Sequence, residues 1–176
     1  ELKIVRDDLL GLSKTVDSVL SLAKNAKQDS TGFHGSISLP FERIIRMHEK
    51  EIREKSLEIN KNFRDSVYTG VSYAHLEIIL KNILANAIKY SHDHGVIEIE
   101  GVFGESGMYV ITVRDYGIGM SPDELQKVFT RHYRGKNVKS QEGSGIGLQL
   151  VKDLCDRHNI AITLESQQGT GTTVRL

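Results

Sequence analysis

Three short motifs in this chain carry the residue types needed to hold a nucleotide. They are the segments 82–86 (Asn-Ile-Leu-Ala-Asn), 115–119 (Asp-Tyr-Gly-Ile-Gly) and 143–148 (Gly-Ser-Gly-Ile-Gly-Leu). The first puts two amides on a predicted helix, the second puts an acid before two spaced glycines, and the third is a glycine-rich turn that opens another helix. Each motif alone is common. All three, in this order within one short domain, are hard to explain by packing, so we expect a nucleotide site.

The first motif belongs to a polar stripe on a helix predicted over residues 73–91. At about 100° per residue, Asn82, Asn86 and Lys89 fall on one side of that helix. An amide oxygen is a neutral ligand that suits a Mg²⁺ ion held mainly by phosphate oxygens and water, and Lys89 lies one turn later, where it could meet a phosphate. The alternative is a solvated polar face on which Asn86 only hydrogen-bonds a neighbouring loop.

The second motif follows a predicted apolar strand. A carboxylate at a strand end, here Asp115, can accept a hydrogen bond from an exocyclic amine such as that of adenine. Gly117 and Gly119 would let the backbone approach a flat ligand closely. The alternative is an ordinary β-turn, in which Asp-x-Gly is a frequent composition.

The third motif offers backbone N–H groups and a helix N-terminus to an anionic phosphate, through Gly143, Gly145 and Gly147. It differs from the dinucleotide-binding fingerprint in spacing and lacks the Lys-Ser/Thr ending of a P-loop. A flexible hinge is the alternative. Five residues just upstream carry or can carry positive charge and favour a lid that closes over phosphates: Arg131, His132, Arg134, Lys136 and Lys139.

The remaining pattern alternates helices with strands, several of them joined by hairpins. Helices are expected over 1–27, 41–54, 73–91 (capped by Ser72), 146–158 and a short stretch after the cap Ser121, and strands over 36–39, 57–59, 96–102, 108–113, 160–165 and 172–176. We predict an α/β (α+β) two-layer sandwich, with a mixed, mostly antiparallel sheet and helices on one face. A long amphipathic helix would precede it.

Composition narrows the function classes. The chain has 39% hydrophobic and 26% charged residues, as ordinary globular proteins do. Lys plus Arg equals Asp plus Glu at 23 each, so no net charge attracts nucleic acid. No run of about 18 apolar residues appears. The single cysteine, Cys155, fits core packing and a reducing compartment, which favours the cytoplasm. Because the chain starts without Met in a helical pattern, we expect it to be a fragment.

Four ordered segments resemble the N, G1, F and G2 boxes of the ATP-binding catalytic domain of two-component sensor histidine kinases, a Bergerat-type fold. These segments are 82–91, 115–120, 128–134 (with Val128-Phe129 and Tyr133-Arg134) and 143–148. The resemblance covers residues 34–176. It implies that residues 1–30 are a remnant of the dimerisation helix, although an independent coiled-coil linker stays possible.

The resemblance assigns roles to individual residues. It implies that Asn86 binds Mg²⁺, that Asp115 accepts the adenine amine, and that Gly117 and Gly119 line the base pocket. It further implies that Thr172 contacts adenine, that Lys89, Tyr90, Tyr133 and Arg134 approach the phosphates or the lid, and that Gly143, Gly145, Gly147 and Leu148 form the phosphate-side turn.

One position bears on the reaction. Related ATPases of the superfamily have a glutamate as general base four residues before the metal-binding Asn, and this chain has Asn82 there. An amide cannot take a proton from water at neutral pH. We therefore count Asn82 and Arg134 as the catalytic pair of a site that transfers the γ-phosphoryl of ATP.

The acceptor histidine would lie elsewhere, because none of the seven histidines stands in the family's phosphoacceptor context. The implied partners are a phosphoacceptor segment of the same or a sister subunit, a response regulator, and a second copy in the full-length protein. The rival hypotheses are a same-fold ATPase that acts as a clamp and a non-catalytic module that binds a partner.

Overall fold

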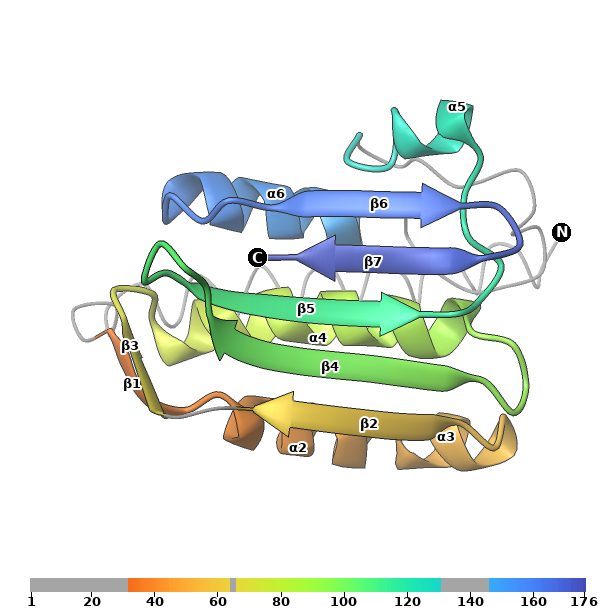
Figure 1. The fold of residues 1–176 in the computed structure, drawn as a ribbon, viewed down its shortest axis with the longest axis horizontal. Helices are drawn as coiled ribbons and strands as arrows, with labels where there is room; N and C mark the ends of the chain where they lie inside the picture. The colour runs from red at the N-terminus through yellow and green to blue at the C-terminus, as the bar shows by residue number, and fades with distance from the viewer. Residues whose placement is uncertain (1–31, 64–65, 131–145) are drawn as a thin grey trace, which may run out of the picture.

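The computed structural model describes residues 32–63, 66–130 and 146–176 (Figure 1). The predicted helix over 1–27 and the proposed segment 1–30 lie outside these ranges, as do the residues of the predicted lid, 131–139. The elements are β1 (Phe33–Ser36), α2 (Ser38–Met47), α3 (Glu49–Glu54), β2 (Glu58–Phe63), β3 (Ser66–Thr69), α4 (Tyr73–Tyr90), β4 (Val96–Phe103), β5 (Tyr109–Asp115), α5 (Pro122–Leu125), α6 (Gly147–Arg157), β6 (Thr163–Gln167) and β7 (Gly171–Arg175).

Five strands form the main sheet in the order β2-β4-β5-β7-β6. β2 and β4 run parallel, and the other neighbouring pairs are antiparallel. The predicted mixed, mostly antiparallel sheet is therefore confirmed. The register pairs Asp115, the last residue of β5, with Thr172 on β7, which brings the first residue of the motif 115–119 beside a residue 57 positions away in the chain.

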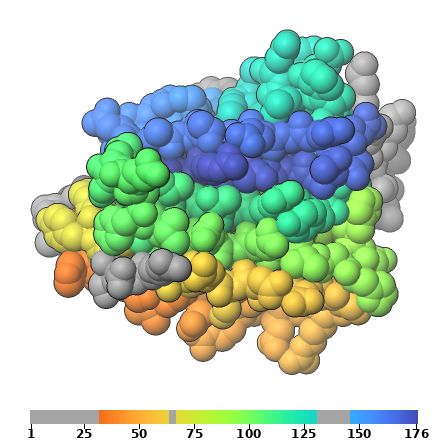
Figure 2. All heavy atoms as spheres, viewed as in Figure 1, coloured from red at the N-terminus to blue at the C-terminus, as the bar shows by residue number. Residues whose placement is uncertain are grey.

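The helices cover a single face of this sheet. In Figure 1, α2, α3, α4 and α6 all lie behind the strands. The alternation along β4 explains why, because Ile97 and Ile99 are buried toward the helices while Glu98 and Glu100 face solvent. In Figure 2, which looks onto the same open face, the strands' own side chains form the surface. The predicted two-layer sandwich is confirmed.

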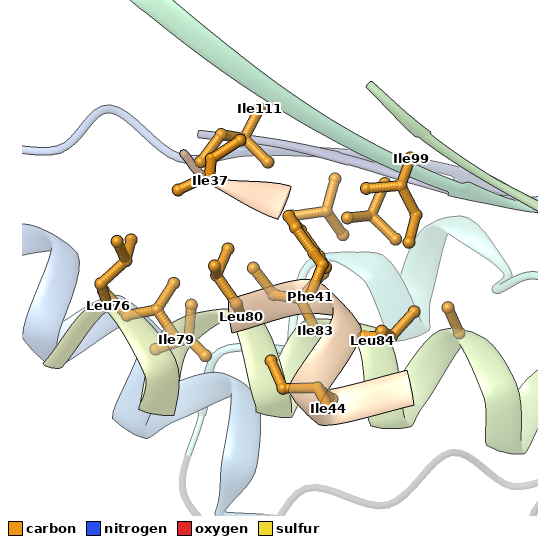
Figure 3. Close-up of a cluster of buried hydrophobic side chains, with 14 of the residues drawn as sticks. Ile37, Phe41, Ile44, Leu76, Ile79, Leu80, Ile83, Leu84, Ile99 and Ile111 are labelled. Atoms are coloured by element: carbon orange, nitrogen blue, oxygen red, sulfur yellow. The ribbon is translucent and has the colours of Figure 1, made fainter. Parts of the chain in front are cut away.

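The core lies between α4 and the sheet and is closed by α2 (Figure 3). The apolar face of α4 is buried along its whole length, and its members are Leu76, Ile79, Leu80, Ile83, Leu84, Ala87 and Ile88. Phe41 and Ile44 of α2 pack into the same cluster and are fully buried. This burial fixes the rotation of α4 and turns its polar stripe away from the core.

Two predicted helix starts are confirmed in detail. The Ser72 hydroxyl accepts a hydrogen bond from the N–H of His75 and caps α4. Ser121 and Glu124 form a reciprocal capping box at the start of α5, with Pro122 in the first helical position.

The prediction was wrong around residues 36–54. The predicted strand 36–39 is replaced by β1, which ends at Ser36, and α2 begins at Ser38, because β1 pairs with β3, a strand the sequence pattern did not reveal. Pro40 sits within the first turn of α2, where it needs no N–H partner. The single helix predicted over 41–54 is interrupted at His48, and α3 follows as a separate short helix.

Candidate functional site

The polar stripe of α4 forms one side of the candidate site. Asn82, Asn86 and Lys89 are all half-buried, as expected for side chains at the edge of a packed helix. The Nδ2 of Asn82 donates to the Ile78 carbonyl at 2.8 Å. The side chain of Asn86, in contrast, has no hydrogen-bond partner among the described residues. Asn86 is therefore the amide on this stripe that is available to a ligand.

Asn82 also sets the distance between α4 and the start of α6. A methyl group added to Gly147, the first residue of α6, would lie 2.7 Å from the Asn82 Oδ1. Gly147 is thus required for close packing of the two helices, a role that the sequence did not indicate. Leu148 follows it in the first turn of α6 and is half-buried.

Asp115 lies at the end of β5 and is 6% exposed. The N–H of Gly117 donates to its Oδ1 at 3.0 Å, and the backbone of Thr172 supplies a second hydrogen bond. Burial nevertheless raises the pKa of this carboxyl from 3.8 to about 6, because these two bonds and the charge of His92 only partly offset the loss of hydration. No Lys or Arg forms an ion pair with Asp115 within the described ranges.

Gly117 and Gly119 hold the chain against two other segments. A Cβ on Gly117 would lie 2.0 Å from the carbonyl oxygen of Tyr90, at the end of α4. Gly119 has φ +58°, and a Cβ there would lie 1.9 Å from the Gln167 carbonyl oxygen. The turn 115–119 is therefore packed tightly between α4 and the β6–β7 hairpin. This packing by itself requires glycine at both positions, whether or not a ligand binds.

A hydroxyl pair extends the polar cluster beside Asp115. The Ser166 Oγ accepts from the N–H of Met120, donates to the carbonyl of Gly171 and lies 2.9 Å from the Thr172 Oγ1. Because the single hydroxyl proton of Ser166 is used on Gly171, Thr172 must donate to Ser166. The Thr172 oxygen then offers only lone pairs to any further partner. Ser166 was missed by the sequence, since nothing marks one serine in a polar hairpin.

The other residues predicted for the phosphate side divide into two groups. Lys89 and Tyr90 end α4, with the Lys89 Nζ 5.0 Å from the centroid of the Tyr90 ring. The remaining predicted residues, Tyr133, Arg134, Gly143 and Gly145, lie outside the described residues.

Cys155 lies on the buried face of α6. Cys155 is fully buried, and burial raises the pKa of its thiol to about 11, which confirms core packing.

His75 of α4 and His158 after α6 are joined by a 2.7 Å contact between Nδ1 and Nε2. Spacing in the sequence gave no sign of this contact, because 83 positions separate the two rings. His75 is 2% exposed, which makes it unsuitable as a phosphoacceptor.

Residues 72–176 match the family described as histidine kinase-, DNA gyrase B- and HSP90-like ATPase. The match covers more than half of the chain. The chain belongs to this family. The matched residues include the whole candidate site, from the cap of α4 to the end of β7. The match therefore confirms the Bergerat-type resemblance.

Named relatives place the chain with the sensor histidine kinases of this ATPase family. It is 28% identical over 178 residues to the sensor histidine kinase WalK of Bacillus subtilis, covering 98% of this chain and 29% of that protein. It is 31% identical over 180 residues to the methanogenesis regulatory histidine kinase FilI of Methanothrix harundinacea, covering 99% and 19%. The chain thus spans less than a third of either relative and contains a histidine kinase ATP-binding catalytic domain.

Solved structures agree on the fold. The Acinetobacter baumannii histidine kinase AdeS superposes with a TM-score of 0.73 at 18% identity, covering 99% of this chain and 82% of that one. The mycobacterial sensor histidine kinase MprB gives a TM-score of 0.67 at 24% identity, covering 82% of this chain and 95% of that one.

Among the described residues, none of the helices has both the length and the apolar character that a membrane span requires.

Proposed function

We propose that this domain binds Mg-ATP at the site formed by the polar stripe of α4 and by Asp115, and that it donates the γ-phosphoryl group to a histidine of a phosphoacceptor segment. That segment would belong to the same or a sister subunit and would pass the phosphoryl group to a response regulator. The parent protein would act as a homodimer, with this domain in the cytoplasm, where ATP is supplied. Family membership and the named relatives support the proposal.

One observation carries the nucleotide assignment: Asp115 is a buried carboxyl with a raised pKa and no Lys or Arg ion pair in the described structure. The hydrogen bonds from Gly117 and Thr172 only partly offset the cost of burying this carboxylate, so a further donor would stabilise it. The exocyclic amine of adenine is a fitting donor, since both Asp115 and the Thr172 oxygen present acceptors. Gly117 and Gly119, which hold this turn against α4 and the β6–β7 hairpin, would line the base pocket.

The residues present also fit a magnesium ion. The Asn86 amide has no hydrogen-bond partner among the described residues and sits half-buried on α4. This suits Mg²⁺, which commonly takes one or two protein ligands and otherwise keeps phosphate oxygens and water. When bound, the ion would neutralise charge on the phosphates during transfer.

The state of Asn82 favours transfer over hydrolysis. Its Nδ2 is used within α4 and its Oδ1 faces Gly147, so neither atom can act as a base toward water. The contribution of this domain to phosphoryl transfer would be positioning and charge stabilisation. Lys89 is the described cation of the site, and Arg134 belongs to the proposal by family resemblance.

The direct test is calorimetric titration with a non-hydrolysable ATP analogue, with and without Mg²⁺. We expect Mg²⁺-dependent binding by the wild-type chain. In Asn86→Ala the dependence on Mg²⁺ should be lost and affinity should fall at least about tenfold, the loss of one ligand and its charge-assisted contacts. The matched control is Asn60→Ala, an exposed amide on β2, which should bind as wild type does.

The reaction itself is tested with γ-labelled ATP and a separately supplied phosphoacceptor helix pair from a sensor histidine kinase. Acid-labile label on the acceptor would support histidine phosphorylation. Steady phosphate release by this chain alone would instead support the clamp ATPase. Failure of a folded sample to bind any nucleotide would support the partner-binding module.

A further inference from the structure

The last turn of α4 ends beside a lysine from another part of the chain. The ammonium of Lys55 donates to the carbonyl oxygens of Ile88, Lys89 and Ser91, at 3.0, 2.6 and 2.9 Å. An ammonium has three protons, so all its donors are used on this helix end. Carbonyls at a helix C-terminus have no partner within the helix and carry partial negative charge, which a cation stabilises.

The neighbouring carbonyls of this turn are satisfied as well. The Ala87 oxygen accepts from both the N–H and the hydroxyl of Ser91, at 3.0 and 2.7 Å. The Tyr90 oxygen accepts from the N–H of Ile118 at 3.1 Å. The carbonyls from 87 to 91 therefore all have identified partners. The bond from Ile118 is the one that ties the turn 115–119 to α4.

The backbone of Lys55 is itself held in place by two hydrogen bonds, one on each side of the residue. It follows α3 directly, where its N–H donates to the Glu51 carbonyl at 3.1 Å. Its own carbonyl accepts from the N–H of His94 at 2.7 Å, in the loop after α4. α3 and the last turn of α4 lie at the same end of the sheet in Figure 1. No carboxylate within the described ranges forms an ion pair with Lys55, so the helix end is the partner of this charge.

We infer that Lys55 is a positioning residue for the nucleotide site. Its ammonium holds the backbone of residues 88–91 where the Tyr90 carbonyl accepts the hydrogen bond from Ile118. At the same place Gly117 lies so close to the Tyr90 carbonyl that no Cβ would fit. Without this ammonium, the last turn of α4 loosens, and the turn that carries Asp115 into the base pocket loses its support. The role rests on the proposed nucleotide site, although Lys55 itself is not part of the polar stripe.

The test compares Lys55→Met with Lys61→Met, an exposed lysine on β2 that the described structure leaves without a partner. Two readouts are measured. The first is amide hydrogen exchange of Ile118 without nucleotide, with Val113 in the sheet as internal reference. The second is the affinity for the non-hydrolysable ATP analogue with Mg²⁺. We expect Lys55→Met to speed exchange at Ile118 relative to Val113 and to weaken nucleotide binding about 5- to 30-fold, and Lys61→Met to change neither.

A chemical rescue separates charge from general damage. In Lys55→Cys, alkylation with 2-bromoethylamine rebuilds a lysine-like ammonium, whereas iodoacetamide adds a neutral group. Cys155 is fully buried and its thiol has a pKa of about 11, so the native protein should react at position 55. Recovery of Ile118 protection and nucleotide affinity with the amine, and not with the amide, supports the assignment.

The outcomes are distinct. If the wild type binds nucleotide and Lys55→Met binds it equally well with unchanged Ile118 exchange, the inference is overturned and the proposed function stands. If the wild type binds no nucleotide, the proposed function fails and this role fails with it. If Lys55→Met is too unstable to measure, the two alkylated forms of Lys55→Cys decide between charge and packing.

Discussion

Replacing Asp115 with Asn should stabilise the nucleotide-free protein at neutral pH while it weakens nucleotide binding. The carboxyl is 6% exposed, and its burial raises the pKa from 3.8 to about 6. A group whose pKa is raised in the folded state contributes stability that is complete below the unfolded pKa and is lost as pH rises through the folded value. At pH 7.5 the ionised Asp115 therefore costs about 3 kcal/mol relative to its protonated form.

Asparagine removes this dependence because it does not titrate. Its amide oxygen can keep the hydrogen bond from Gly117, but its NH₂ group cannot accept the second bond from Thr172, a loss of about 1 kcal/mol that is the same at every pH. The informative quantity is therefore the change with pH. Between pH 5 and 7.5, wild type should lose about 1.4 kcal/mol of unfolding free energy relative to Asp115→Asn.

The assay is urea denaturation without nucleotide at pH 5.0, 6.0 and 7.5. Circular dichroism is the suitable probe because the chain has no tryptophan. The difference in unfolding free energy between the two proteins is taken at each pH from curves with equal slopes. A calorimetric titration at pH 7.5 supplies the functional half, where the variant should bind the ATP analogue about 10- to 100-fold more weakly.

Parallel pH profiles for wild type and Asp115→Asn would refute the reasoning, because they would mean that the buried carboxyl has no raised pKa. Unchanged nucleotide affinity in the variant would refute the assignment of Asp115 to the adenine amine and leave the stability argument intact.

Three further predictions test the packing around the site. Gly117→Ala should lower the unfolding free energy by about 2 kcal/mol or more, because a Cβ would lie 2.0 Å from the Tyr90 carbonyl oxygen; the control Gly70→Ala, where a Cβ meets nothing within 4 Å, should change thermal unfolding little, and equal effects would contradict the close contact. Ser166→Ala should reduce ATP-analogue affinity about 3- to 10-fold, since Thr172 loses its acceptor; titration of both proteins decides, and no change would mean that Thr172 does not face the base. Cys155 should stay unmodified by a thiol reagent at pH 8 until urea unfolds the chain, and rapid labelling of the folded protein would show that the thiol is not buried as described.

Much of the fold was predictable because its helices and strands have strong periodicity. The apolar face of α4 and the alternation along β4 are local signals, and each has one way to be buried. Ser72 and Ser121 were equally predictable, because a capping serine acts on N–H groups only two or three residues away. The region 36–54 was mispredicted because β1 depends on pairing with β3, some 33 positions later, and no local pattern encodes that partner.

The candidate site shows the same division. The sequence by itself determined which residue types could form a nucleotide site, namely the amide of Asn86, the acid Asp115 and the glycines of the turn after it. The tertiary structure decided what surrounds them: the burial of Asp115 and its raised pKa, the lone pairs left on Thr172 by Ser166, and the ammonium of Lys55 on the end of α4. Burial, hydrogen bonds between side chains and helix-end capping arise between segments that only folding brings together. The residue types could therefore be read from the sequence, and their environments could not.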